Sequence, residues 1–145
     1  MQTTIKSIQW VGTPEERIVS TRKFRQYVNG LDFSTAIEKV KQVWMESPTI
    51  VKEQFNIMDE SSYPSPWDLF SWNFFSPNAK ILGMFYTLLL SNHSQHHDIW
   101  LGIAEDMLEG ERAELVVDFD PRKKYTYQKM ISKYDLRDWS KDNGK

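Results

Sequence analysis

The chain has 145 residues, of which 40% are hydrophobic and 26% are charged, and its formal net charge is −2. This composition excludes wholesale disorder, and the small negative charge argues against a general affinity for nucleic acid. The absence of cysteine excludes disulfides, thiolate nucleophiles and cysteine-based metal centres. The length matches the commonest size of one folded domain, roughly 100–150 residues, so we expect a single domain over residues 1–145.

The apolar runs of the sequence predict a cytoplasmic protein that makes no membrane contact. The first six residues lack the apolar core of a signal peptide. The most apolar run, residues 81–90, is much shorter than a membrane span of ~20 residues. A cysteine-free sequence also suits a reducing compartment.

The first half of the chain predicts one strand and three helices. Residues 4–11 are rich in β-forming side chains, which favours a strand. The residues 13–16, Thr-Pro-Glu-Glu, form a capping-box pattern that predicts a helix to about Val28, with a hairpin as the alternative. A stripe of apolar residues at helical spacing predicts the next helix, beginning at Ser34 or Thr35. Residues 48–55 then predict a short third helix.

The middle of the chain predicts the core of the fold. Two Ser-Pro pairs, Ser65-Pro66 and Ser76-Pro77, are typical of helix starts, because serine can cap and proline fits the first helical position. The first pair predicts a helix over residues 67–72. The second begins a segment that is apolar on almost every face, which predicts a buried central helix over about 77–91.

The last third of the chain completes an α+β prediction. Apolar spacing predicts a helix over residues 99–109 and an amphipathic helix over 125–139, and the polar tail 140–145 is expected to fray. Residues 113–119 carry the best strand signal in the sequence. We therefore predict a mostly helical α+β domain around the central helix, with a small sheet that includes 113–119 and that residues 4–11 could join.

The segment 63–75 carries an unusual density of aromatic residues. If the short helix within it packs one face into the core, the opposite face leaves large aromatics exposed, and exposed aromatic patches tend to be binding sites. Burial between two core layers is the alternative. The main functional hypothesis is accordingly a small non-enzymatic binding or regulatory accessory protein, whose partner is another protein or a second copy of the chain. Its predicted binding residues are Tyr63, Trp67, Phe70, Trp72 and Phe75, with Phe74 beside them.

All three histidines fall in one short loop, His93, His96 and His97, followed by Asp98. Imidazole and carboxylate groups bind divalent transition metals. A metal-binding protein or metal-dependent hydrolase is therefore the alternative hypothesis, and no other cofactor is predicted. The loop lacks the glutamate that metalloproteases place between two histidines. A solvated loop beside the negative end of the preceding helix would explain the same residues.

Charged clusters give a second alternative. The basic run Arg122–Lys124 lies near Tyr125 and Tyr127, and Arg22-Lys23 lies near Arg25. Basic residues beside aromatics can hold a phosphate and stack a base, which suggests nucleotide or nucleic-acid binding. Solvated surface is the plainer interpretation of both runs. The acidic residues Glu105, Asp106, Glu109, Glu111 and Glu114 are expected to form the exposed face of the predicted helix at 99–109 and the chain after it.

Overall fold

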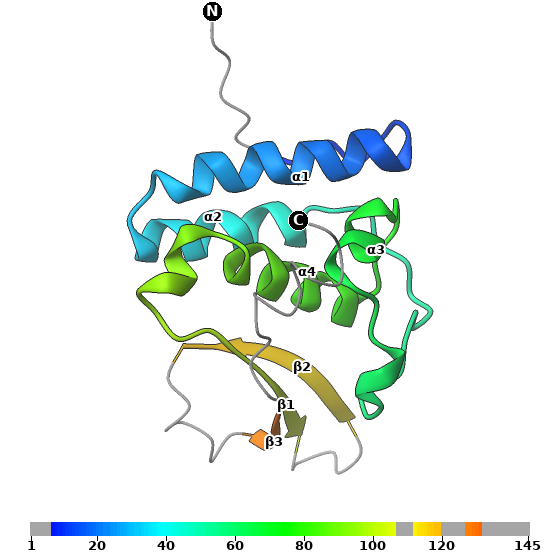
Figure 1. The fold of residues 1–145 in the computed structure, drawn as a ribbon. Coiled ribbons are helices and arrows are strands. Elements are labelled where there is room, and N and C mark those ends of the chain that lie inside the picture. Colours follow the sequence, from blue (N-terminus) through cyan, green and yellow to red (C-terminus); the bar gives the residue numbers. More distant parts are fainter. Residues whose placement is uncertain (1–6, 107–111, 120–126, 132–145) are drawn as a thin grey trace, which may run out of the picture.

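The computed structural model describes residues 7–106, 112–119 and 127–131. In these ranges the fold is α+β, as predicted: helices and a small antiparallel sheet lie on either side of one central helix, α4 (Figure 1). The long helices are α1 (Pro14–Asn29), α2 (Phe33–Met45) and α4 (Pro77–Leu89), with the short helices α3 (Pro66–Ser71), η1 (Glu60–Ser62) and η2 (Asn92–Gln95). The strands are β1 (Trp100–Asp106), β2 (Arg112–Asp118) and β3 (Tyr127–Ile131).

The helices begin where side chains can satisfy their first backbone N–H groups. Thr13 accepts a hydrogen bond from the backbone N–H of Glu16, and the Glu16 carboxylate accepts one from the N–H of Thr13 at 2.7 Å. This reciprocal capping box selects the helix α1 over a hairpin. The side chains of Ser65 and Ser76 cap α3 and α4 by accepting from the backbone N–H groups of Asp68 and Ala79, without a reciprocal bond, and each serine is followed by proline. Asp32, rather than Ser34 or Thr35, caps α2.

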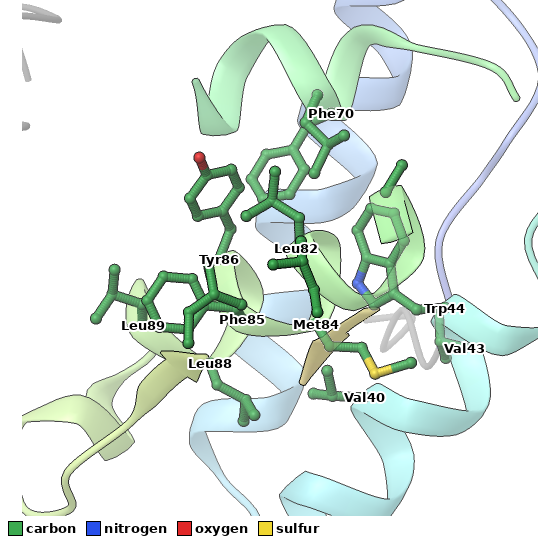
Figure 2. Close-up of a cluster of buried hydrophobic side chains, with 14 of the residues drawn as sticks. Val40, Val43, Trp44, Phe70, Leu82, Met84, Phe85, Tyr86, Leu88 and Leu89 are labelled. Atoms are coloured by element: carbon green, nitrogen blue, oxygen red, sulfur yellow. The ribbon is translucent and has the colours of Figure 1, made fainter. Parts of the chain in front are cut away.

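Helix α4 is buried on nearly all sides, which confirms the predicted central helix. Its residues form the centre of the hydrophobic core together with α2 and α3 (Figure 2). No helix within the described ranges is long and apolar enough to cross a membrane. Because α4 separates the other helices from the sheet, its side chains contact both layers.

A close contact in the core joins Trp44 of α2 to Gly83 of α4. A Cβ atom added at Gly83 would lie 2.5 Å from the indole ring, so only glycine lets the ring rest on the helix backbone. The indole N–H donates to the Thr87 hydroxyl at 3.0 Å, and that hydroxyl donates to the Gly83 carbonyl at 2.7 Å. One glycine and one threonine, a helical turn apart, therefore fix α2 against α4.

The sheet covers the opposite side of α4 in the order β2-β1-β3, with both pairs antiparallel. Leu101 and Ile103 of β1 and Leu115 of β2 are buried, and Ile103 lies opposite Leu115. The alternation of side chains along a strand therefore turns one face of the sheet into the core. The strand β2 confirms the prediction at 113–119.

Two helix predictions in the last third are wrong. Residues 100–106 of the helix predicted at 99–109 are instead the strand β1, and residues 107–109 lie outside the described residues. Ile99, Leu101 and Ile103 alternate along this segment and are all buried, so a period of two explains the pattern better than a helical stripe. Residues 127–131 of the helix predicted at 125–139 are the strand β3. The rest of that segment, and the tail 140–145, lie outside the described residues.

Two predictions in the first half are also wrong. Residues 48–55 contain no helix, because Thr49 forms a parallel bridge with Phe75 and the N–H of Phe75 donates to Pro48. Residues 7–11 form no strand and β2 pairs with β1 instead, while 4–6 lie outside the described residues. Ile8 is buried, and Trp10 packs edge-on against Trp44 at 4.9 Å. Both segments are held by tertiary contacts that local sequence patterns do not encode.

The contact between Trp44 and Gly83 predicts an unusual response to Gly83→Ala. In the middle of a helix this change ordinarily stabilises by ~0.5–1 kcal/mol. Here the new methyl group overlaps the indole ring, and overpacking costs roughly 1–3 kcal/mol. We expect a net loss of about 1 kcal/mol in the free energy of unfolding, measured by urea denaturation.

The matched control is Gly30→Ala, after the end of α1. There the added Cβ would lie 3.6 Å from the Tyr27 carbonyl oxygen, an ordinary contact, and the backbone conformation suits alanine. The stability of this variant should stay within about 0.5 kcal/mol of the wild type. A Gly83→Ala variant as stable as the control would contradict the described contact.

Candidate functional site

The structure places most of the predicted aromatic surface inside the protein. Phe70 and Phe75 are 0% exposed and belong to the core. Tyr63, Trp67 and Trp72 are partly buried and pack against it. The physical reason is that α3 lies between α1 and α4, so both of its faces meet other helices. The five side chains therefore do not form one exposed patch, and the alternative of burial between core layers describes this segment better.

Phe74 is the aromatic of this segment that keeps the most exposed surface, at 50%. It precedes the bridge between Thr49 and Phe75, and its carbonyl accepts a hydrogen bond from the Gln54 amide at 3.0 Å. Ile50 and Val51, across this bridge, are exposed as well. Three exposed apolar side chains, Phe74, Ile50 and Val51, thus belong to the two segments that this bridge joins.

The first histidine of the predicted metal loop has a structural role. His93 is buried in η2, and its Nε2 lies 3.0 Å from the carbonyl oxygen of Val28 in α1. A carbonyl oxygen only accepts hydrogen bonds, so Nε2 must carry the hydrogen and donate it. A nitrogen in that state has no lone pair left for a metal ion. This hydrogen bond ties the segment after α4 to the end of α1.

The remaining residues of the loop do not gather around a common point. His97 stacks on Phe33 with ring centroids 3.8 Å apart and planes 8° apart, while His96 and Asp98 are exposed. Among the described residues, no three His, Cys, Asp or Glu side chains are placed to hold a metal ion. The geometry of these residues gives the metal hypothesis no support. The loop instead packs against the end of α1, through His93, and against the start of α2, through His97.

Asp32 belongs to the same junction. Hydrogen bonds from Thr35 are the main reason that the pKa of Asp32 lies below its usual value, and the nearby His93 contributes to the shift. The Asp32 carboxylate thus stays charged as the cap of α2. It lies near the His93 ring, which contacts Val28 of α1 and Phe33 of α2. Each of these contacts is explained by the local structure without a ligand.

The charged clusters are separated by the fold or fall outside its described part. Glu105 and Asp106 lie in the strand β1 and not on a helix, and Glu114 is exposed on β2. Glu109, Glu111, the basic run at 122–124 and Tyr125 are outside the described residues. Tyr127 begins β3. The described residues therefore offer no acidic helix face of the kind that the sequence predicted.

A largely apolar groove lies between α2, α4 and β2. It has a volume of about 420 Å³, within the range of roughly 300–1,000 Å³ typical of ligand sites. We call it the α2–α4–β2 groove. It is lined by Ile37, Glu38, Val40, Lys41, Met45, Ile81, Met84, Leu88, Val116, Val117 and Phe119.

Each wall of this groove comes from a different element. Met84 and Leu88 of α4 are buried residues of the core, and Figure 2 shows Met84 pointing toward Val40 of α2. Met45, the last residue of α2, is 54% exposed and ends the opposite wall. Methionine is unbranched and polarisable, so it adapts to apolar partners of different shapes. The groove is thus apolar at its base and adaptable at its edge.

The third wall, β2, is an edge strand whose outer backbone groups are partly occupied. The N–H of Leu115 donates to the Asn78 side chain at 2.9 Å, so it points away from β1. Outward and inward residues alternate in an antiparallel pair, so the N–H of Val117 also points outward. The N–H of Phe119 donates to the Asp118 carboxylate at 2.7 Å. Side chains therefore block the edge on both sides of Val117, as natural edge strands often arrange.

A more polar cavity of about 470 Å³ adjoins the groove and shares Met45 and Ile81 with it. Lys80 lines this cavity and is buried, and desolvation lowers its pKa. Its ammonium group donates to the carbonyl oxygens of Met45 and Ser47, at 3.1 and 2.9 Å, and to the Thr49 hydroxyl at 2.6 Å. All three acceptors are neutral, and together they use the three N–H donors of the ammonium group. Lys80 thereby connects α4 to the end of α2.

Sequence patterns could not identify the groove, because its residues come from three distant segments. Ile37 and Val40 are part of the helical stripe that predicted α2, and Val116 and Val117 are part of the strand signal. Only the tertiary arrangement leaves them side by side. Comparisons of the chain with protein-family models, with curated proteins and with solved structures find no match.

The role of His93 leads to a direct test of the histidine loop. His93→Ala removes the hydrogen bond to Val28 and leaves a space in a packed junction, so we expect a loss of about 1–3 kcal/mol in the free energy of unfolding. His96→Ala, on an exposed residue of the same loop, should change it by less than about 0.5 kcal/mol. Both values are measured by denaturant unfolding, with and without EDTA.

The two hypotheses for this loop differ in the EDTA measurement. A structural His93 gives the same loss with and without the chelator. A metal held by the loop would stabilise the folded state, so EDTA would lower the stability of the wild type. That result would revive the metal hypothesis.

Proposed function

We propose that this protein is a binding module that holds an amphipathic helix of a partner protein in the α2–α4–β2 groove. The observation that supports this proposal is a largely apolar groove of about 420 Å³ with charged residues at its rim. The proposal keeps the predicted class, a binding or accessory protein, and moves the site away from the aromatic segment. The lack of cysteine suits a reducing compartment, which supports the cytoplasm as its location.

The shape of the groove favours a helix over an added strand. A partner strand would need the outward backbone groups at this edge, and side chains occupy the N–H groups of Leu115 in β2 and of Phe119 directly after it. A helix brings no such requirement, because its own backbone groups are already paired. Helix-in-groove recognition uses apolar side chains at positions i, i+3 or i+4 and i+7, on one face of the partner. The groove between α2 and α4 presents apolar side chains to such a face.

Charged residues at the rim of the groove would favour one orientation of the partner helix. Glu38 and Lys41 of α2 are exposed, line the groove and lie one helical turn apart with opposite charges. A partner helix whose polar flank carries a basic residue opposite Glu38 and an acidic residue opposite Lys41 would fit in one orientation. Such rim pairs contribute to specificity and association rate more than to affinity.

A partner protein fits this surface better than a second copy of the chain. A symmetric dimer would place the same patch of both copies against each other. Two concave surfaces leave a space between them. The long helices of the described part already pack their apolar faces into their own core. A partner that brings a convex apolar helix is therefore the occupant we propose.

The test uses a displayed library of helical peptides, with apolar residues varied at i, i+3, i+4 and i+7. Selected peptides should bind the purified domain in a fluorescence anisotropy titration. Met45→Glu places a carboxylate at the apolar wall, and its desolvation should weaken binding by about tenfold or more, equal to ~1.4 kcal/mol. Proline at the centre of a selected peptide should abolish binding, because it breaks the helix.

The matched control is Met58→Glu. Met58 is 62% exposed, similar to Met45 at 54%, and it lies outside the groove. This variant should bind the selected peptides like the wild type. Equal losses in both variants, or a library that yields no helical binder, would refute the proposal. Dimerisation through the groove, seen by light scattering and abolished by Met45→Glu, would replace the partner helix with a second copy.

A further inference from the structure

Helix α1 buries a polar stripe against α3. Arg17, Thr21 and Arg25 follow at intervals of four residues and share one face of the helix. They are 7%, 1% and 8% exposed, respectively. Arg25 lies beside Arg22 and Lys23 in the sequence, but the structure separates it from them, since Arg22 and Lys23 are exposed. The interval of four residues from Arg17 through Thr21 to Arg25 is the sequence signal that places Arg25 on the buried face of the helix.

The two buried arginines differ in what they bind. The guanidinium of Arg17 donates twice to the carbonyl of Ser71, at 3.0 and 2.7 Å, and once to the carbonyl of Gly12. The guanidinium of Arg25 has one hydrogen-bond acceptor among the described residues, the Thr21 hydroxyl at 3.3 Å. At nearly equal burial, Arg17 is satisfied and most N–H groups of Arg25 are uncommitted.

Arg25 lies in a frame suited to an anion. Its guanidinium carbon is 5.5 Å from the Trp67 ring and 5.4 Å from the Phe70 ring, which hold its plane in place. Its Nε and Nη2 make no hydrogen bond within the described residues, and neither is among the fully buried, unpartnered side-chain atoms of that part of the chain, so both keep some contact with solvent. A planar guanidinium with free N–H groups binds carboxylate and phosphate oxygens in a bidentate manner.

The surrounding charges make an anion favourable. Burial lowers the pKa of Arg25 to about 10, and repulsion by Arg22, one turn away, acts in the same direction. A buried charge without a counter-ion is costly. A bound anion would compensate Arg25 and also attract Arg22. This observation is independent of the α2–α4–β2 groove, whose lining contains neither arginine.

We propose that Arg25, framed by Trp67 and Phe70 and assisted by Arg22, forms a binding site for an oxyanion, a carboxylate or a phosphate group. The two aromatic rings frame one arginine and leave most of its N–H groups available, whereas each of the three guanidinium nitrogens of Arg17 on the same helix face donates to a carbonyl oxygen. Such a site recognises the charged group of a larger ligand or of a partner.

The experiment follows arginine side-chain N–H signals by NMR while inorganic phosphate or acetate replaces chloride at constant ionic strength. The Arg25 Nε signal should shift and saturate, and the Arg17 Nε signal should stay in place as an internal control. The signal of Arg25 is assigned by its disappearance in Arg25→Lys. The tighter of the two ions identifies the source chemistry, phosphate or carboxylate. Equal shifts of Arg17 and Arg25, or shifts that do not saturate, would overturn the proposal.

Thermal unfolding gives a second readout. Phosphate or acetate should raise the Tm of the wild type, because an ion that binds only the folded state stabilises it. Arg25→Met keeps the apolar contacts to Trp67 and Phe70 and should lose this rise entirely. Arg25→Lys keeps a charge without the planar fork and should bind about tenfold more weakly. A rise in Tm that persists in Arg25→Met would also overturn the proposal, and the NMR titration stands even if that variant fails to fold.

Discussion

The fold depends on the contact between the indole of Trp44 and the backbone of α4 at Gly83. Thr87 binds the indole nitrogen, so the orientation of the ring is fixed as well as its position. Trp10 and Phe75 then pack edge-on against the same ring, at 4.9 and 5.1 Å between centroids. The side chain of Trp44 is therefore the meeting point of three segments, which lie before α1, after α3 and within α2. The resulting distance between α2 and α4 also sets the width of the α2–α4–β2 groove.

Buried cations complete this arrangement by satisfying helix ends. The last carbonyl groups of a helix have no partner within it. Lys80 of α4 binds the carbonyls of Met45 and Ser47 at the end of α2, and Arg17 of α1 binds that of Ser71 at the end of α3. A cation is also favourable there because of the helix dipole. These two charges are thus part of the packing, whereas Arg25 meets no helix end and keeps its N–H groups available.

Sequence patterns predicted those parts of the fold that short-range physics decides. The capping residues Thr13, Ser65 and Ser76 work within four residues of themselves, so α1, α3 and α4 could be located in advance. The strand at 100–106 could not, because its apolar residues satisfy both a helical and a strand period, and only pairing with β2 decides between them. The site was harder still: no local pattern tells which face of a short aromatic helix meets another helix, or that residues of three segments enclose a groove.

The groove and the core share side chains, and this limits how the site can vary. Met84, Leu88 and Val40 are buried parts of the core while they line the groove, so a change in any of them alters stability together with binding. Met45, Glu38 and Lys41 stand at the rim and carry little of the core. Specificity can therefore change at the rim at low cost to the fold, while the floor stays apolar because the interior requires it. If the groove holds the proposed partner helix, that helix would be selected by its apolar face first and by its flanking charges second.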